Sequence, residues 1–234
     1  MSTEPTDDSV RLNKFLAYHK GISRREADSL IEQGRATVNH QPVSLGARVA
    51  PEDVIAIDDI PVVLKTDHTT ILFNKPIGYV CSRRQQGTTP TIYSLVPDAY
   101  QHLKTVGRLD RDSSGIIILT DDGDLAHQMT HPSFHKTKIY NVTLDQPLQP
   151  LHRQMISDYG VALDDGKSQF ELERLEEPQL DTHWQITMHE GRNRQIRRTF
   201  AALGYTVTAL HRTQFGRYSL GDISPGTAQI IDTR

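Results

Sequence analysis

The nine residues from 107 to 115, GRLDRDSSG, combine the groups that a catalytic loop needs. The carboxylate of Asp110 lies between two arginines, Arg108 and Arg111, and two serines follow it. The loop leads into the apolar run 116–119, whose β-branched residues and flanking turn residues indicate a short buried strand. A carboxylate held at the edge of a rigid sheet can act as a nucleophile or a base. An isolated Leu-Asp-Arg sequence would equally fit a solvated turn, so other parts of the chain must decide.

Three further motifs accompany this loop in order along the chain. They are 74–82 (NKPIGYVCS), 138–142 (KIYNV) and 190–198 (EGRNRQIRR). Together with 107–115 they resemble the motifs of pseudouridine synthases, in the branch of that family that modifies ribosomal RNA. The resemblance extends over nearly the whole chain, and Ser113 stands where the family more usually has threonine. Four ordered matches are hard to obtain by chance, so the resemblance favours the catalytic interpretation of the loop.

The resemblance also implies roles for three side chains. Asp110 is expected to initiate cleavage of the glycosidic bond, Tyr140 to pack against the target base and assist proton transfer, and Arg197 to pair with Asp110. The reaction breaks the bond from C1′ to N1, rotates the uracil and joins C1′ to C5, so it implies no cofactor. The nucleotide must be flipped out of its helix into a pocket. Whether Asp110 attacks the sugar or the base, or abstracts the 2′ proton to give a glycal, stays open.

Helix geometry separates the arginines of the last motif. Ile196 and Phe200 mark the buried stripe of a helix predicted over 193–203, and Arg197 flanks that stripe. An arginine near a core needs an anion, because a buried unpaired charge is costly. On the opposite helix face and in the loops, RNA phosphate and plain solvent are both natural partners. The arginines that we expect at RNA are Arg24, Arg25, Arg108, Arg111, Arg192, Arg194 and Arg198.

A second arginine-containing helix is predicted near the start of the chain. The sequence 23–26 (SRRE) is a capping box that begins this helix, and Gly34 ends it. Arg24 and Arg25 fall in its first turn, where the helix dipole disfavours cations unless a phosphate binds nearby. Solvated arginines are the alternative interpretation. The order of elements resembles the S-four-type RNA-binding module, first known from a ribosomal small-subunit protein.

The predicted architecture is α+β, with a small N-terminal α/β RNA-binding module before a catalytic domain that has a mixed or antiparallel sheet. We expect a disordered tail at 1–10, the module at 11–58, a linker at 59–68 and the catalytic domain at 69–234. Strands are predicted at 36–38, 54–57, 70–74, 116–119, 138–144, 169–175, 182–188 and 205–210, and helices of the catalytic domain at 124–130 and 193–203. Alternation in strand 138–144 places Tyr140, Val142 and Leu144 on one face.

Composition agrees with a local rather than a uniform basic surface. The chain has 234 residues and a formal net charge of −3. Seven Lys/Arg and three Asp/Glu lie between Arg11 and Arg48, whereas eight acidic and two basic residues lie between Asp158 and Asp181. A basic docking face suffices for binding ribosomal RNA, either free or in a subunit precursor. The single cysteine and the lack of a signal peptide or membrane-spanning apolar run indicate a cytoplasmic protein, which we expect to be a monomer.

Two possible metal sites are not favoured by the sequence. His127, His131 and His135 recur every four residues, but Pro132 interrupts the helix that would align them. The acidic run 121–124 is too short for a calcium loop with a distal glutamate. We therefore predict no metal.

Two other functions remain to be weighed against the enzyme. One is a noncatalytic RNA-binding or ribosome-assembly factor, which would have no need to keep Asp110, Tyr140 and Arg197 together. The other is a metal-dependent phosphodiesterase that uses Asp110, Asp112 and the acidic run, and it predicts that chelators abolish activity. The three intact side chains favour the synthase.

Overall fold

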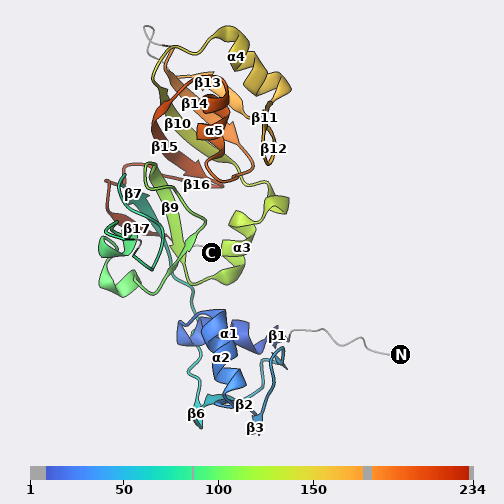
Figure 1. Ribbon diagram of the computed structural model, residues 1–234. Helices are drawn as coiled ribbons and strands as arrows, with labels where there is room; N and C mark the ends of the chain where they lie inside the picture. The colour runs from blue at the N-terminus through green and yellow to red at the C-terminus, as the bar shows by residue number, and fades with distance from the viewer. Residues whose placement is uncertain (1–8, 86, 176–180, 232–234) are drawn as a thin grey trace. The chain divides into compact units, whose positions relative to one another are not determined.

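The computed structural model describes residues 9–85, 87–175 and 181–231 (Figure 1). It divides into two compact units. The first contains the residues before Thr69 together with Asp121–Gly123, and the second contains Thr69–Thr120 and Asp124–Arg234. None of the described helices is long and apolar enough to cross a membrane. Each unit has an apolar core of its own.

The first unit consists of two helices and several short strands. Its helices are α1 (Leu12–Lys20) and α2 (Arg24–Glu32). Its strands are β1 (Val10–Arg11), β2 (Ala36–Val38), β3 (Gln41–Pro42), β4 (Arg48–Val49), β5 (Ile55–Ile57) and β6 (Ile60–Pro61). Strands β3, β2, β5 and β6 form one sheet in that order, and β1 pairs with β4.

The predicted capping box of α2 is confirmed. The Ser23 hydroxyl accepts a hydrogen bond from the Glu26 amide, and the Glu26 carboxylate accepts one from the Ser23 amide. The cap satisfies backbone donors that the first helical turn leaves free. It also fixes the start of the helix, so that Arg24 and Arg25 stand exposed in the first turn.

The boundaries of this unit differ in detail from the expected ones. Val10, in the expected tail 1–10, pairs with Val49 between β1 and β4, while residues 1–8 lie outside the described residues. The expected linker 59–68 begins with β6, which pairs with β5, and Val62 is buried in the core. These residues stay with the unit because apolar side chains and ladder hydrogen bonds anchor them.

The second unit is built on a nine-stranded mixed sheet with short helices. Its strands are β7 (Thr70–Lys75), β8 (Lys104–Val106), β9 (Ser114–Thr120), β10 (Lys138–Leu144), β13 (Glu171–Arg174), β14 (His183–Met188), β15 (Val207–Phe215), β16 (Tyr218–Ser219) and β17 (Ala228–Ile231), and β11 (Val161–Leu163) and β12 (Gly166–Ser168) form a separate hairpin. Its helices are η1 (Ile92–Ser94), η2 (Asp98–Tyr100), α3 (Gly123–Thr130), η3 (Pro132–Phe134), α4 (Pro150–Gln154), η4 (Met155–Tyr159) and α5 (Gln195–Ala202).

The order along the main sheet is β13, β14, β10, β15, β9, β7 and β17, with β16 on β15 and β8 on β9. Strands β9 and β15 pair in parallel, with Ser114 opposite His211 and Gly115 opposite Arg212. Gly115 has a φ of 108°, and a Cβ there would lie 2.1 Å from the Arg212 carbonyl oxygen. Only glycine permits this approach. The junction brings the loop before β9 next to the end of β15.

Helix α5 covers the half of the sheet made by β10, β14 and β15 (Figure 1). Its apolar stripe, with Ile196 and Phe200, packs against Val142 and Ile186 in one continuous core. The strand predicted over 138–144 is confirmed, and Tyr140, Val142 and Leu144 are buried on one face as expected. This packing fixes the segment before α5 against the sheet.

Two differences from the predicted elements matter for the site. The predicted strand 205–210 instead runs from Val207 to Phe215, because pairing with β10 carries it past Leu210. The helix predicted over 193–203 begins only at Gln195, because Arg194 adopts a left-handed φ of 47°. Strands β8 and β17, and the β11–β12 hairpin, lack a strong sequence pattern and were not predicted.

Candidate active site

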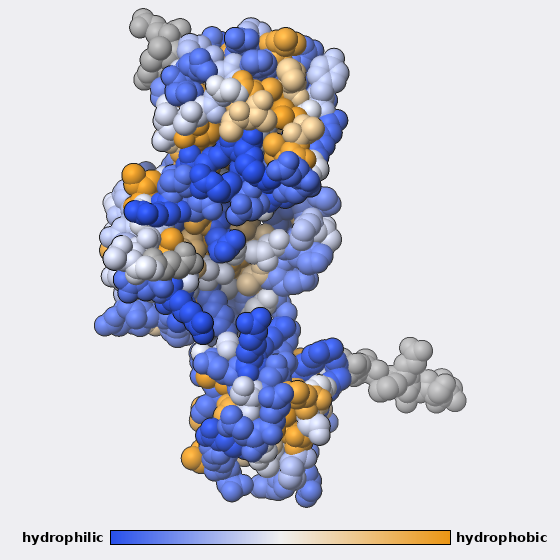
Figure 2. Space-filling view, viewed as in Figure 1, coloured by the Kyte–Doolittle hydropathy of each residue, from blue (hydrophilic) through white to orange (hydrophobic). Residues whose placement is uncertain are grey.

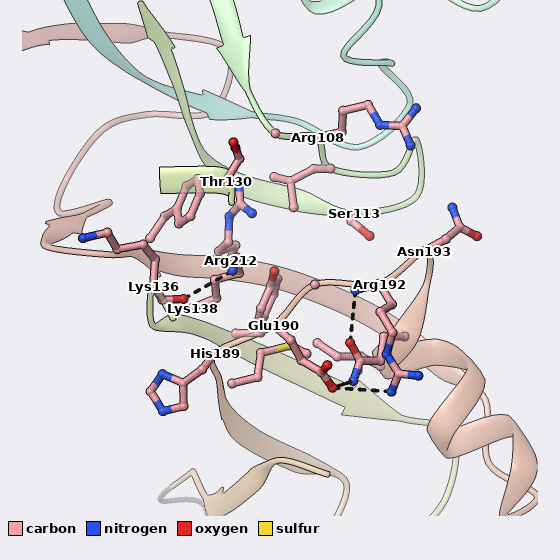
Figure 3. Close-up of a pocket in the computed structure, with 18 of the residues that line it drawn as sticks. Arg108, Ser113, Thr130, Lys136, Lys138, His189, Glu190, Arg192, Asn193 and Arg212 are labelled. Atoms are coloured by element: carbon pink, nitrogen blue, oxygen red, sulfur yellow. Dashed lines mark hydrogen bonds and ion pairs between the residues drawn. The ribbon is translucent and has the colours of Figure 1, made fainter. Parts of the chain in front are cut away.

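A pocket of about 590 Å³ opens in the second unit along β10 and β15. The loop before β9, the end of α3 and the segment that leads into α5 complete its walls. Figure 2 shows hydrophilic side chains gathered in a band across this unit, and Figure 3 shows the side chains of the pocket. Five of the predicted residues line it: Arg108, Asp110, Tyr140, Arg192 and Arg194.

The loop that carries Asp110 is held in place by the buried ammonium of Lys75. Lys75, at the end of β7, is completely buried and donates to the carbonyl oxygens of Ser113 (2.6 Å) and Pro76 (3.0 Å). Burial lowers the pKa of Lys75, while the nearby charges of Asp110 and other acidic groups act in the opposite direction. The Gly78 amide also donates to Arg111 within the loop (2.7 Å). Asp110 therefore stands on a fixed backbone at the edge of the pocket.

Tyr140 projects from the middle of β10 and is 7% exposed. Its ring belongs to the apolar core beneath α5, together with Leu109 of the catalytic loop. Both residues also line the pocket. The ring thus forms an apolar surface beside Asp110, suited to stacking against a planar base.

The arginine nearest to Asp110 is not the one that we expected. Arg197 is mostly buried and donates to the backbone carbonyls of Val207 (2.7 Å) and Asp112 (2.8 Å), and its Nε lies 3.3 Å from the Asp112 carboxylate. Arg194 instead places a terminal nitrogen 3.6 Å from Asp110 Oδ2. Arg194 does not lie on the predicted helix face, because this residue precedes α5 in a left-handed conformation.

The two carboxylates of the loop therefore have different partners. Arg194 donates two hydrogen bonds of 3.0 Å to Asp112, and this contact holds the pKa of Asp112 below its usual value. The same contact raises the pKa of Arg194, whereas burial lowers that of Arg197. Asp112 ties the loop to α5, and Asp110 keeps its side chain at the pocket.

Arg192 and Arg198 are engaged within the protein rather than facing open solvent. Both contact Asp165 in the turn of the β11–β12 hairpin, at 2.8 Å for Arg192 and 2.6 Å for Arg198. Arg192 also donates to the carbonyl of Lys167 (2.9 Å). The phosphate contacts expected of these two arginines have to compete with Asp165, which lies far from them in sequence.

The other arginines expected at RNA are free of carboxylate partners among the described residues. Arg108 and Arg111 are exposed on the catalytic loop, and Arg108 lines the pocket. Arg24 and Arg25 are exposed on α2 of the first unit. Free exposed guanidinium groups suit phosphate binding.

No group of three or more metal-binding side chains occurs within residues 9–85, 87–175 and 181–231. Helix α3 ends at Thr130, and Pro132 begins the separate helix η3, as the proline predicted. His127 and His131 stack with their ring centres 4.8 Å apart, while His135 has a left-handed φ of 43°. The three imidazoles are not aligned on one continuous helix.

Several cations of the site were not predicted from the sequence, among them Lys75, Lys138 and Arg212. Lys138 had a usable signal, because it lies two residues before Tyr140 and so shares its strand face. Lys75 had only its place in the motif 74–82, and Arg212 had no signal, since the contacts of both depend on how β7 and β15 meet β9.

The fold and this site agree with comparisons to known proteins. A family model described as RNA pseudouridylate synthase matches residues 69–202, and an S4 domain model matches residues 10–55. The chain therefore belongs to the RNA pseudouridylate synthase family, and an S4 domain precedes its synthase domain. The expected family, fold class and isomerase class are confirmed.

Individual relatives are similar over nearly their whole length. The ribosomal small subunit pseudouridine synthase A of Yersinia pestis is 35% identical, covering 96% of this chain and 95% of that protein. The protein of the same name from Pasteurella multocida is 37% identical over 91% of both chains. A crystal structure of a pseudouridylate synthase superposes with a TM-score of 0.67 at 33% identity, covering 95% of this chain and 96% of the other.

Proposed function

We propose that this protein converts a uridine of small-subunit ribosomal RNA to pseudouridine. The observation that carries the proposal is Asp110, held at the mouth of a pocket beside Tyr140 in a domain of the synthase family. The small-subunit substrate is inferred from relatives that carry this activity in their names and match almost the entire chain.

The proposed roles follow from what the isomerisation requires. Asp110 initiates cleavage of the bond from C1′ to N1, either by direct attack or by removing the 2′ proton. Tyr140 supports the detached uracil while it turns, after which C1′ bonds to C5. The proton on C5 is then lost, and Tyr140 assists this step. N1 ends the reaction carrying a proton, so the isomerisation is balanced without an oxidant or a cofactor.

Arg197 acts on Asp110 through the loop. Its bonds to the carbonyls of Asp112 and Val207 join the loop to β15, and Arg194 supplies the nearest positive charge to the Asp110 carboxylate. We assign Arg197 a positioning role and Arg194 an electrostatic one.

RNA binding is assigned to both units. Arg24 and Arg25 contact phosphates through the S4 domain, and Arg108 and Arg111 contact the strand around the flipped nucleotide. Arg192 and Arg198 contribute only where RNA displaces Asp165. The protein acts as a monomer in the cytoplasm, in keeping with its ribosomal substrate and its single cysteine.

The deciding experiment measures tritium release from 5-tritiated, unmodified small-subunit ribosomal RNA. The purified protein should release tritium, and carbodiimide-stopped reverse transcription should then find one new pseudouridine. Large-subunit RNA is the control substrate. Tritium release from large-subunit RNA alone would contradict the assigned substrate. Binding of either RNA without tritium release would indicate a noncatalytic RNA-binding protein.

A further inference from the structure

Two cationic side chains line one end of the pocket (Figure 3), and neither forms an ion pair with a carboxylate of the described residues. Lys138 comes from β10 and Arg212 from β15, where the register pairs Lys138 with Phe215 and Tyr140 with Arg212. The register shifts by one residue within this stretch, at Thr213. The bulge lets Arg212 and Phe215, three residues apart, both face the pocket.

Arg212 is a buried cation that the protein satisfies only in part. It is 3% exposed, and its Nε donates to the carbonyl of Ile116 (2.9 Å). One terminal nitrogen is enclosed and has no hydrogen-bond partner in the part of the chain that the structure describes. The guanidinium carbon lies 4.6 Å from the ring centre of Phe215 and 6.0 Å from that of Tyr140. Aromatic faces offset only part of the cost of burying such a charge, so the group needs an anion.

Lys138 faces the same space. Its ammonium lies 5.4 Å from the Phe215 ring centre, and within the described residues it donates to one neighbouring carbonyl, that of Lys136 (3.3 Å). Burial lowers the pKa of Lys138, the charge of Arg212 lowers it further, and Glu190 acts in the opposite direction. Two desolvated cations that disfavour one another are stabilised by a shared anion.

We propose that Lys138 and Arg212 form a subsite for one backbone phosphate of the RNA, beside the position of the target base. A phosphodiester has two charged oxygens that can accept from an ammonium and a guanidinium at once. Tyr140 shares the strand face of Lys138, which places the subsite within one nucleotide of the base. The inference rests on the proposed function, because it assigns the anion to the RNA substrate.

The first test measures binding of unmodified small-subunit ribosomal RNA transcript as a function of salt. Lys138→Met and Arg212→Met should each raise Kd about tenfold and reduce the slope of log affinity against log salt by about one. The double variant should be little weaker than either single variant, because both side chains act on one phosphate. Lys104→Met is the matched control, since Lys104 pairs with Thr120 at the far end of β9. Unchanged slopes, or fully additive losses, would overturn the proposal.

Arg212→Lys separates loss of charge from loss of packing. It keeps the cation, so it should restore most of the salt slope that Arg212→Met removes, while circular dichroism shows that both variants fold. A slope that stays low in a folded Arg212→Lys variant would mean that the ring contacts, and not an anion, explain this residue.

A second test needs no turnover. Uridine 5′-monophosphate or uridine 3′-monophosphate should raise the Tm of the wild-type protein more than uridine does, and this difference should vanish in the two methionine variants. If inorganic phosphate stabilises as strongly as either nucleotide, the subsite binds free phosphate and the assignment to RNA is wrong. The nucleotide preference of the methionine variants tests the subsite alone. Tritium release by the wild-type protein tests the proposed function.

Discussion

Asp110 and Asp112 lie two residues apart, yet the fold gives them different tasks. The Asp112 carboxylate receives two hydrogen bonds from Arg194, and its backbone carbonyl accepts one from Arg197. The Asp110 side chain instead borders the pocket, with Arg194 3.6 Å away. Asp112, whose carboxylate lies closer to the arginines, is thus structural. Asp110 is the candidate catalytic residue.

Replacing Asp110 by asparagine should abolish tritium release while leaving folding and RNA affinity intact. Asparagine keeps the size of the side chain but lacks the negative charge that attack or proton removal requires, so we expect a loss of about a thousandfold or more. Asp112→Asn is the control on the same loop and should retain much more activity. Substantial release by the Asp110 variant would remove the central claim.

Arg197→Met should lower both activity and stability. It breaks two hydrogen bonds from a charged donor to backbone carbonyls, at a cost to the free energy of unfolding of about 2 kcal/mol. We expect kcat to fall with little change in Kd for RNA. Arg198→Met is the comparison, because its exposed pair with Asp165 should affect neither kcat nor stability strongly. If Arg197→Met changed only RNA affinity, the positioning role would be wrong.

At the scale of elements, the parallel contact between β9 and β15 holds the site together. It aligns Gly115 with Arg212 and joins Ser114 to His211, whose ring nitrogen lies 2.8 Å from the serine hydroxyl. The catalytic loop leads directly into this contact, and Arg212 of the proposed phosphate subsite is part of it. Weakening it should therefore disturb both.

His211 makes this contact sensitive to pH. Burial lowers its pKa below the ordinary value of 6.5, so the unfolded chain takes up a proton more readily than the folded one. Stability from this group is present above pH 6.5 and is lost as the pH falls below it. Urea unfolding from pH 7.5 to 5 should show this loss in the wild type and less of it in His211→Gln. Equal pH profiles would show that the histidine does not control the junction.

At the scale of the whole molecule, a net charge of −3 accompanies binding to a polyanion. The charges are segregated, because the first unit carries exposed arginines while Asp165 and its neighbours gather on the β11–β12 side. Only the docking surface has to neutralise phosphates.

Replacing Arg24 and Arg25 by alanine in the full chain should weaken RNA binding and flatten its salt dependence, with kcat nearly unchanged. The free protein should become slightly more stable, since the α2 dipole disfavours cations in its first turn. Deleting residues 1–68 should weaken RNA binding and flatten its salt dependence more strongly than the double alanine variant does. An unaltered salt slope in the double alanine variant would show that these arginines are merely solvated.

The sequence by itself determined features whose local pattern is strong. A period of two placed Tyr140 on the buried face of its strand, and a four-residue box placed the start of α2, because both are set by local backbone geometry. The motif around Asp110 located the loop because its turn residues border a short apolar strand. Local patterns of this kind therefore predict the local structure directly.

Only the tertiary structure decided which charges meet. Arg194, not Arg197, approaches Asp110, because the helix begins two residues later than predicted and Arg194 itself adopts a left-handed conformation. Lys138 and Arg212 converge through a bulge in the pairing of β10 with β15, which no local pattern reveals. Contacts between residues some seventy to a hundred positions apart depend on strand register, and register is set by the packing of the whole sheet.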